Sequence, residues 1–176
     1  MSFQQRRDLG RFGERLLEAY FDHHRYPFWR SGIENLVPDI APRVCQTLPP
    51  SLRFLPDYNV SLNGHLVWVE LKTSLFIERE AFTSYLEIDG RQPVYLCFYV
   101  KRTLSMVRVT DLVFRTPDTT RPDHMPTDGI WKQPSKWDQF ADWKKRNPNA
   151  SGSDYAEIDP AATPLRPLTM PTPQAS

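Results

Sequence analysis

The sequence of 176 residues predicts an α/β domain with a mixed central sheet flanked by helices. Three observations support this fold class. An amphipathic helical pattern opens the chain, two alternating strand-like segments meet at Asn63-Gly64, and a later segment, residues 93–100, is apolar on both faces. A strand of that last kind is typical of a sheet covered by helices on each side. The length supports one domain, which we expect over residues 1–147.

Residues from Phe3 to about His24 predict an amphipathic helix. Apolar residues and one glycine recur there at helical spacing and form a single stripe: Leu9, Phe12, Gly13, Leu16, Leu17, Tyr20 and Phe21. At about 100° per residue, Glu14 falls on the margin of this stripe and Glu18 points away from it. A short strand near Phe28-Trp29 is expected to follow.

The segments Phe54–Leu62 and His65–Thr73 predict two strands joined by a two-residue turn, because Asn-Gly is the strongest short-range hairpin signal. The turn fixes the register, so Asp57 faces Glu70 with Cβ atoms roughly 4.5–5.5 Å apart. The period of two returns Lys72 to the same face. The other face is apolar and fit for a core: Tyr58, Val60, Leu62, Val67, Val69 and Leu71.

A second helix and two more strands are expected after the hairpin. Thr73 or Ser74 would cap a helix from Leu75 to about Ile88. Residues 93–100 then predict a buried central strand, and residues 104–109 predict one further strand beside it.

The chemistry of the hairpin follows from three side chains on one face. Asp57 and Glu70 carry like charges at directly opposed positions, which destabilises a sheet unless a cation lies between them. A hard cation such as Mg²⁺ takes carboxylate, water and phosphate oxygens as ligands. The ammonium of Lys72 could orient or deprotonate an attacking water, or stabilise charge on a phosphate. Hydrolysis of a phosphodiester is the reaction that this trio fits best.

These residues resemble the signature of the PD-(D/E)XK nuclease superfamily, which has the restriction-endonuclease-like fold. Pro56-Asp57 is followed, after twelve residues, by Glu70-Leu71-Lys72. The expected order of elements also matches the αβββαβ core of that family, and the resemblance covers roughly residues 9–112. It implies a metal-dependent endonuclease that hydrolyses phosphodiester bonds in DNA, with Mg²⁺ as the cofactor and Mn²⁺ as a substitute.

The resemblance also implies roles for individual residues. Asp57 and Glu70 would hold the ion, with the Leu71 carbonyl and Glu14 as further ligands. Lys72 would position or activate the water. Many relatives form dimers to cut both strands, so a homodimer is one expected assembly. The choice between DNA and RNA, the structure or sequence that is cut, and the number of metal ions stay open.

Nucleic acid is the expected partner. Arg11, Thr73 and Ser74 are candidate contacts, and Tyr85 on the second helix would either reach the active site or the nucleic acid, or lie in the core. The formal net charge of +1 excludes a strongly basic nucleic-acid-binding protein. A bound metal ion would supply part of the positive field.

Three other interpretations of the sequence stand beside this one. Glu70 and Lys72 could form an ordinary surface ion pair in an unrelated α/β protein, in which case Asp57 would lie far from Glu70 or on another face. The chain could be a catalytically silent member of the same fold that binds nucleic acid or serves as an assembly subunit. Pro38-Asp39 could replace Asp57, but the surrounding prolines disfavour a paired strand there.

Composition bounds the remaining features. Two cysteines, Cys45 and Cys97, make no disulfide framework, and no Cys/His cluster has zinc spacing. The start of the chain lacks the apolar segment of a signal peptide, and no apolar run is long enough to span a bilayer, so we expect a cytoplasmic protein without a membrane partner. The Pro-rich residues 148–176 predict a disordered tail.

Overall fold

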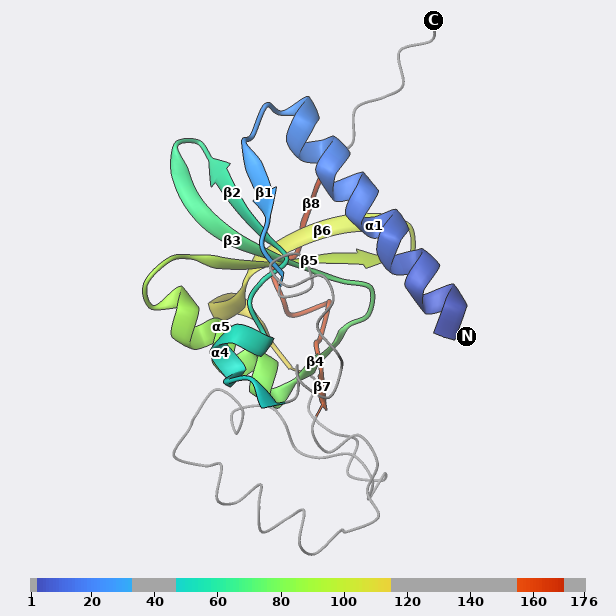
Figure 1. The fold of residues 1–176 in the computed structure, drawn as a ribbon. Coiled ribbons are helices and arrows are strands. Elements are labelled where there is room, and N and C mark those ends of the chain that lie inside the picture. Colours follow the sequence, from blue (N-terminus) through green and yellow to red (C-terminus); the bar gives the residue numbers. More distant parts are fainter. Residues whose placement is uncertain (1–2, 33–46, 115–154, 170–176) are drawn as a thin grey trace, which may run out of the picture.

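The computed structural model describes residues 3–32, 47–114 and 155–169 (Figure 1). Its elements in chain order are α1 (Phe3–His23), β1 (Phe28–Arg30), α4 (Pro50–Arg53), β2 (Tyr58–Leu62), β3 (His65–Lys72), β4 (Phe76–Glu78), α5 (Arg79–Asp89), β5 (Val94–Val100), β6 (Thr103–Arg108), the 3-10 helix η1 (Val109–Asp111), β7 (Tyr155–Glu157) and β8 (Arg166–Pro167). Six strands form one sheet in the order β1-β2-β3-β5-β6-β8, and β4 pairs with β7. Only the β3–β5 pair of that sheet is parallel. The predicted α/β class with a mixed sheet is therefore confirmed.

The hairpin between β2 and β3 has the register that the turn predicts. Every pair from Tyr58 opposite Val69 to Leu62 opposite His65 is aligned as expected. Asn63 and Gly64 have φ values of 51° and 83°, and a type I′ turn requires a positive φ at both positions. The strand β2 begins at Tyr58 and not at Phe54, because the short helix α4, which has a proline in its first turn, ends at Arg53 with Phe54 as its C-cap residue.

Two layers of side chains cover the two faces of the sheet. On one face, Leu17 and Phe21 of α1 are fully buried against residues of the hairpin such as Tyr58 and Val69. On the other face, α5 packs with β5, β6 and η1 around Phe82 and Phe98. Figure 1 shows α1 and α5 on opposite sides of the sheet.

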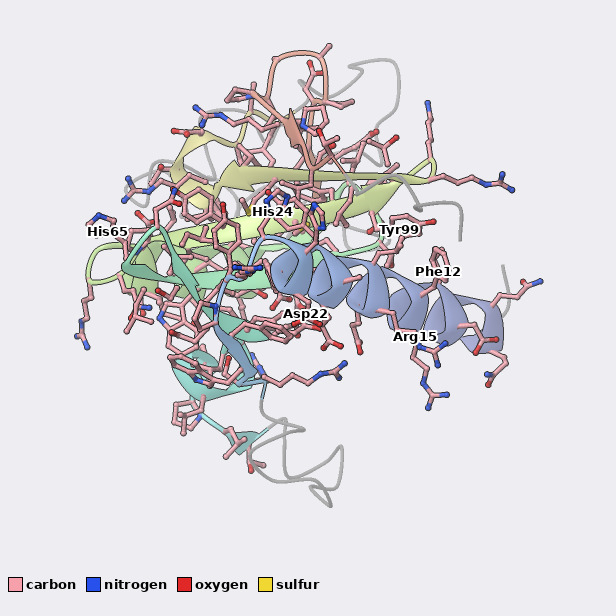
Figure 2. All side chains as sticks on the ribbon, turned by 90° about the horizontal axis from the view of Figure 1, so that it is seen from above. Phe12, Arg15, Asp22, His24, His65 and Tyr99 are labelled. Carbon is pink, nitrogen blue, oxygen red and sulfur yellow. The ribbon has the colours of Figure 1, made fainter. Side chains whose placement is uncertain are left out.

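The stripe predicted on α1 is confirmed along most of its length. The exception is Phe12, which is 49% exposed and rests its ring against Tyr99 with 5.6 Å between the ring centroids. Figure 2 shows these two rings side by side near the start of α1, whereas Arg15 points away from the sheet. Gly13 lies so close to the sheet that a Cβ atom there would be 3.0 Å from Leu71 Cδ2.

The segment after β3 differs from the prediction. The second helix begins at Arg79 and not at Leu75, because Phe76–Glu78 form strand β4 and pair with β7. Thr73 and Ser74 therefore do not cap the helix, and its N-cap residue, Glu78, makes no side-chain capping bond. The partner strand of β4 comes from a distant part of the chain, so no local pattern shows it.

Part of the expected tail belongs to the domain. Residues 155–169 contribute β7 and β8, and Ile158 is fully buried in the cluster around α5. The buried hydroxyl of Thr163 donates to the Val113 carbonyl and accepts from the Val113 N–H group. The prediction of disorder is therefore wrong for residues 155–169, and the domain does not end at residue 147. The rest of the expected tail lies outside the described residues, as do Cys45 and Pro38-Asp39.

In the three stretches that the structure describes, no helix combines the length and the apolar character that a bilayer crossing requires.

Candidate active site

A pocket of about 370 Å³ opens where β2 begins and β3 ends. Its lining comes from the segment before β2, from strands β3 and β4, and from helix α5. Its residues are Arg53, Phe54, Leu55, Asp57, Glu70, Lys72, Ser74, Phe76, Glu78, Ala81 and Tyr85. All three residues predicted to be catalytic therefore lie in one concave site.

Asp57 and Glu70 are held together by two hydrogen bonds that involve the backbone. The Asp57 N–H group donates to Glu70 Oε2 over 3.2 Å, and the Leu71 N–H group donates to Asp57 Oδ2 over 2.8 Å. The Asp57 carbonyl accepts from the Ser31 N–H group over 2.8 Å, which fixes the backbone from the other side. The unrelated-protein interpretation required these carboxylates to lie apart, and the structure contradicts that requirement.

Lys72 supplies the positive charge beside the two carboxylates. Its Nζ atom lies 2.5 Å from Glu70 Oε1 and 3.3 Å from the Tyr85 hydroxyl oxygen. Burial lowers the pKa of Lys72, but the charge and hydrogen bond of Glu70, together with the charges of Asp57 and Glu78, outweigh this effect, so the pKa is raised above its ordinary value. Lys72 therefore stays an ammonium group at neutral pH, which favours charge stabilisation and positioning of water over proton abstraction.

Tyr85 lies between the core and the site. Its ring belongs to the α5 cluster and only 1% of the residue is exposed, while its hydroxyl meets Lys72. Burial, followed by the negative charge of Glu70, raises the pKa of the Tyr85 hydroxyl well above its ordinary value. The phenol therefore stays neutral. Its ring lies in the core and its hydroxyl contacts Lys72, so two of the expected placements are combined, and a contact with nucleic acid stays a prediction.

The structure places the other predicted residues as follows. Ser74 is exposed and lines the pocket, whereas Thr73 is half-buried and is not among the lining residues. Arg11 is exposed on α1, on the helix that covers the opposite face of the sheet. Leu71 contributes its N–H group to Asp57, and its carbonyl as a metal ligand stays a prediction.

Glu14 belongs to an ion network beside α1. Its carboxylate pairs with Arg30 over 3.1 Å, and the same guanidinium pairs with Glu18 over 2.6 Å. The Tyr58 hydroxyl donates to Glu18 over 3.0 Å. Within residues 3–32, 47–114 and 155–169, no three acidic, histidine or cysteine side chains gather closely enough to hold a metal ion. The role of Glu14 as a ligand stays a prediction, and two carboxylates define the candidate metal position.

Six pocket residues were not predicted as functional, and four of them carry a charge or an aromatic ring. Arg53 and Phe54 come from α4 and its end, and Phe76 and Glu78 come from β4. The charge of Glu78 is near enough to raise the pKa of both Lys72 and Tyr85. The sequence gives no local signal for these residues, because their positions depend on the short helix before β2 and on the pairing of β4 with β7.

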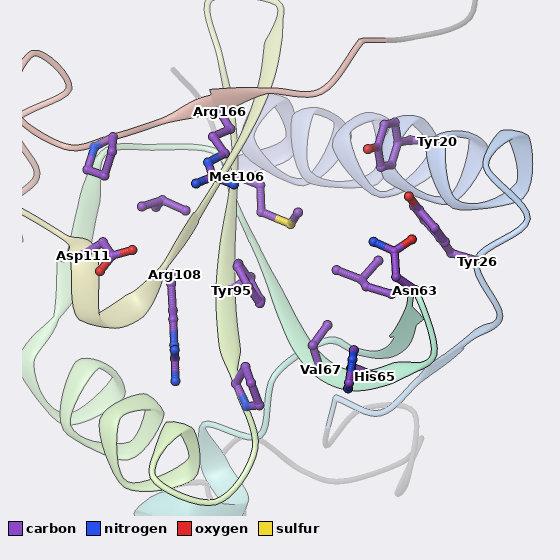
Figure 3. Close-up of a pocket in the computed structure, with 14 residues that line it drawn as sticks. Tyr20, Tyr26, Asn63, His65, Val67, Tyr95, Met106, Arg108, Asp111 and Arg166 are labelled. Carbon is purple, nitrogen blue, oxygen red and sulfur yellow. The ribbon is translucent and has the colours of Figure 1, made fainter.

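A second pocket of about 640 Å³ lies at the turn end of the hairpin (Figure 3). Tyr20 and Tyr26 lie on one side of it, and Arg108 and Asp111 lie on the other. Among its described lining residues, Asp111 is the one carboxylate. A pair of carboxylates is what distinguishes a candidate hydrolytic metal site, so the smaller pocket is the better candidate despite its size.

A scan against models of known protein families finds no match, and a search of curated proteins finds no significant match.

Proposed function

We propose that the chain is a metal-dependent nuclease that hydrolyses phosphodiester bonds in DNA. The observation that carries this proposal is the reciprocal bonding of Asp57 with Glu70-Leu71 in the pocket that also holds the Lys72 ammonium. The order of α1, β1, β2, β3, α5 and β5 agrees with the αβββαβ core of the restriction-endonuclease-like fold. Helix α4, the 3-10 helix η1 and strands β4, β6, β7 and β8 are additions to that order.

The oxygen atoms at the site are of the kind that Mg²⁺ or Mn²⁺ binds. Asp57 and Glu70 supply two carboxylates, the usual number for Mg²⁺ in sites where water and phosphate oxygens complete the ligand set. The Leu71 carbonyl is a further candidate ligand. When bound, the ion would neutralise charge on the phosphate and make a nucleophile available at neutral pH.

The chain's own residues then have separate tasks. The Leu71 N–H group orients the Asp57 carboxylate, and the Asp57 N–H group orients Glu70. Lys72 is a fixed ammonium that stabilises negative charge on the reacting phosphate or orients the water. Tyr85 limits the movement of Lys72, because it accepts a hydrogen bond from Nζ and is itself packed in the core.

The test is cleavage of a panel of linear, circular, branched and RNA substrates with Mg²⁺ or Mn²⁺. We expect cleavage of at least one DNA substrate by the wild-type protein and its loss in Asp57→Ala and Lys72→Ala, each with a circular dichroism spectrum like that of the wild type. Binding of DNA without cleavage of any substrate would favour the catalytically silent alternative. Equal cleavage by the wild type and both variants would show that the activity comes from another site or a contaminant.

A further inference from the structure

Phe76 is an exposed aromatic residue at the rim of the candidate active site. It lines the pocket that holds Asp57 and Glu70, yet 47% of the residue is exposed. Single exposed apolar residues are common on protein surfaces and need no explanation by themselves. Phe76 differs because its ring borders a pocket whose floor carries two carboxylates and an ammonium group.

The backbone of β4 holds Phe76 in this position. Successive residues of a strand point to opposite sides, so Ile77 is buried in the core at 1% exposure while Phe76 and Glu78 both line the pocket. Pairing with β7 places Phe76 opposite Glu157, and the Ile158 N–H group donates to the Leu75 carbonyl over 2.7 Å. The ring is therefore presented by a paired strand and not by a loop.

A second aromatic ring and a cation line the same pocket. Phe54 is half-buried, and the guanidinium carbon of Arg53 lies 4.7 Å from the centroid of its ring. The Arg53 guanidinium also pairs with Glu80 of α5. The pocket thus combines two phenylalanine rings and Tyr85 with an arginine and a lysine beside the candidate metal ligands.

We propose that this site acts on an unpaired strand of DNA, with Phe76 stacking on a base next to the scissile phosphate and Arg53 beside a neighbouring phosphate. This inference rests on the proposed nuclease function and specifies its substrate class. Aromatic side chains bind single strands by stacking on successive bases, and every base offers such a face. In a continuous duplex both faces of each base are already covered by its neighbours, so Phe76 would have nothing to stack on. The small volume of the pocket also favours one strand over two.

The experiment compares three proteins on two substrates. A fluorescein-labelled 20-nucleotide single strand and the blunt duplex of the same sequence are incubated with Mn²⁺ and the wild type, Phe76→Ala or Leu66→Ala. Leu66 is the matched control, because it is 50% exposed and lies outside the pocket, near the turn of the hairpin. A Phe76→Trp variant, which keeps an aromatic face, is measured alongside.

We expect the wild type to cleave the single strand faster than the duplex. Loss of one stacked base predicts a fall in kcat/KM for the single strand of roughly 10-fold in Phe76→Ala, no change in Leu66→Ala and near-normal activity in Phe76→Trp. Melting temperatures of all variants establish that they fold. Faster cleavage of the duplex, or equal single-strand cleavage by Phe76→Ala and the wild type, would overturn the inference while leaving the nuclease function standing.

A binding measurement separates the two proposals if the wild type cleaves neither substrate. Fluorescence anisotropy with the same labelled single strand, in EDTA, reports binding without any metal-dependent reaction. Weaker binding by Phe76→Ala than by Leu66→Ala would support stacking at this rim even if hydrolysis were refuted. Identical binding by the two variants, or tighter binding of the duplex by the wild type, would overturn the inference that Phe76 stacks on a base.

Discussion

Asp57 and Glu70 lie side by side at the ends of adjacent strands, with the Asp57 backbone nitrogen 3.2 Å from Glu70 Oε2. The hairpin register brings the two residues to this position. The backbone then orients both carboxylates, and Lys72 supplies a positive charge beside them. These contacts offset the repulsion between two like charges on one sheet face.

Replacing Asp57 with asparagine is expected to stabilise the metal-free protein. Asparagine retains an acceptor for the Leu71 N–H group and removes the negative charge beside Glu70. We expect the melting temperature in EDTA to rise by roughly 1–4 °C. Addition of Mg²⁺ should raise the melting temperature of the wild type and have little effect on Asp57→Asn. A melting temperature of Asp57→Asn in EDTA that is unchanged or lower than that of the wild type would contradict this.

Lys72 stabilises the fold over a pH range that its raised pKa determines. Below its ordinary pKa of 10.5, Lys72 is protonated in both the folded and the unfolded chain, so its pairing with Glu70 contributes fully. The contribution is lost only as the pH rises through the higher folded-state pKa. Lys72→Met should therefore lower the free energy of unfolding by about 1–3 kcal/mol at pH 7, with the same difference at pH 9.

Urea unfolding of the wild type and Lys72→Met between pH 7 and pH 11.5 checks this prediction. The difference between the two proteins should shrink only above pH 10.5. A difference that grows between pH 7 and pH 9 would mean that the folded-state pKa is lowered, and would favour Lys72 as a base.

The close approach of α1 to the sheet predicts opposite effects at two glycines. A side chain at Gly13 meets Leu71 and Tyr99, whereas a Cβ atom at Gly10 has no heavy atom within 4 Å. Gly13→Leu should lower the free energy of unfolding by about 1–3 kcal/mol through overpacking. Gly10→Leu should raise it by about 0.5–1 kcal/mol, because leucine has the higher helix propensity. Urea denaturation measures both changes in the free energy of unfolding. Equal effects of the two substitutions would refute the close contact of Gly13 with the sheet.

The burial of Ile158 predicts that the segment after residue 154 is required for stability. Ile158→Ala should lower the free energy of unfolding by about 2–5 kcal/mol, because the residue is fully buried in the core. Arg166→Ala, on the exposed side of β8, is the matched control and should change it by less than about 0.5 kcal/mol. If thermal unfolding shows the same midpoint for Ile158→Ala and the control, this segment does not pack as described.

The parts of the structure that the sequence predicts are those set by local rules. Asn63-Gly64 determines the turn, the turn determines the register, and strand alternation places Asp57, Glu70 and Lys72 on one face. The buried strand β5 and the helix α1 were recognisable from their apolar patterns for the same reason.

The parts that the sequence does not predict depend on contacts between distant residues. Because β4 pairs with β7, α5 begins at a later residue than the sequence predicts, and Phe76 lies at the pocket. About 80 residues separate the two paired strands. The composition of the tail predicts disorder, yet Ile158, the Thr163 hydroxyl and the backbone bonds of two short strands hold residues 155–169 on the domain. The short helix α4 places Arg53 at the site, and its sequence shows only a proline at its start.

The most direct test of the central claim is the single-turnover cleavage rate of Glu70→Gln with Mn²⁺ and the best DNA substrate of the wild type. Glutamine keeps the shape and the acceptor for the Asp57 N–H group but removes the charge that a metal ion and Lys72 require. We predict at least a 100-fold loss of rate with an unchanged circular dichroism spectrum, whereas Glu87→Gln, which is exposed on α5 and outside the pocket, should stay within about threefold of the wild type. Wild-type rates in Glu70→Gln would contradict the assignment of this pocket as a phosphodiester hydrolase.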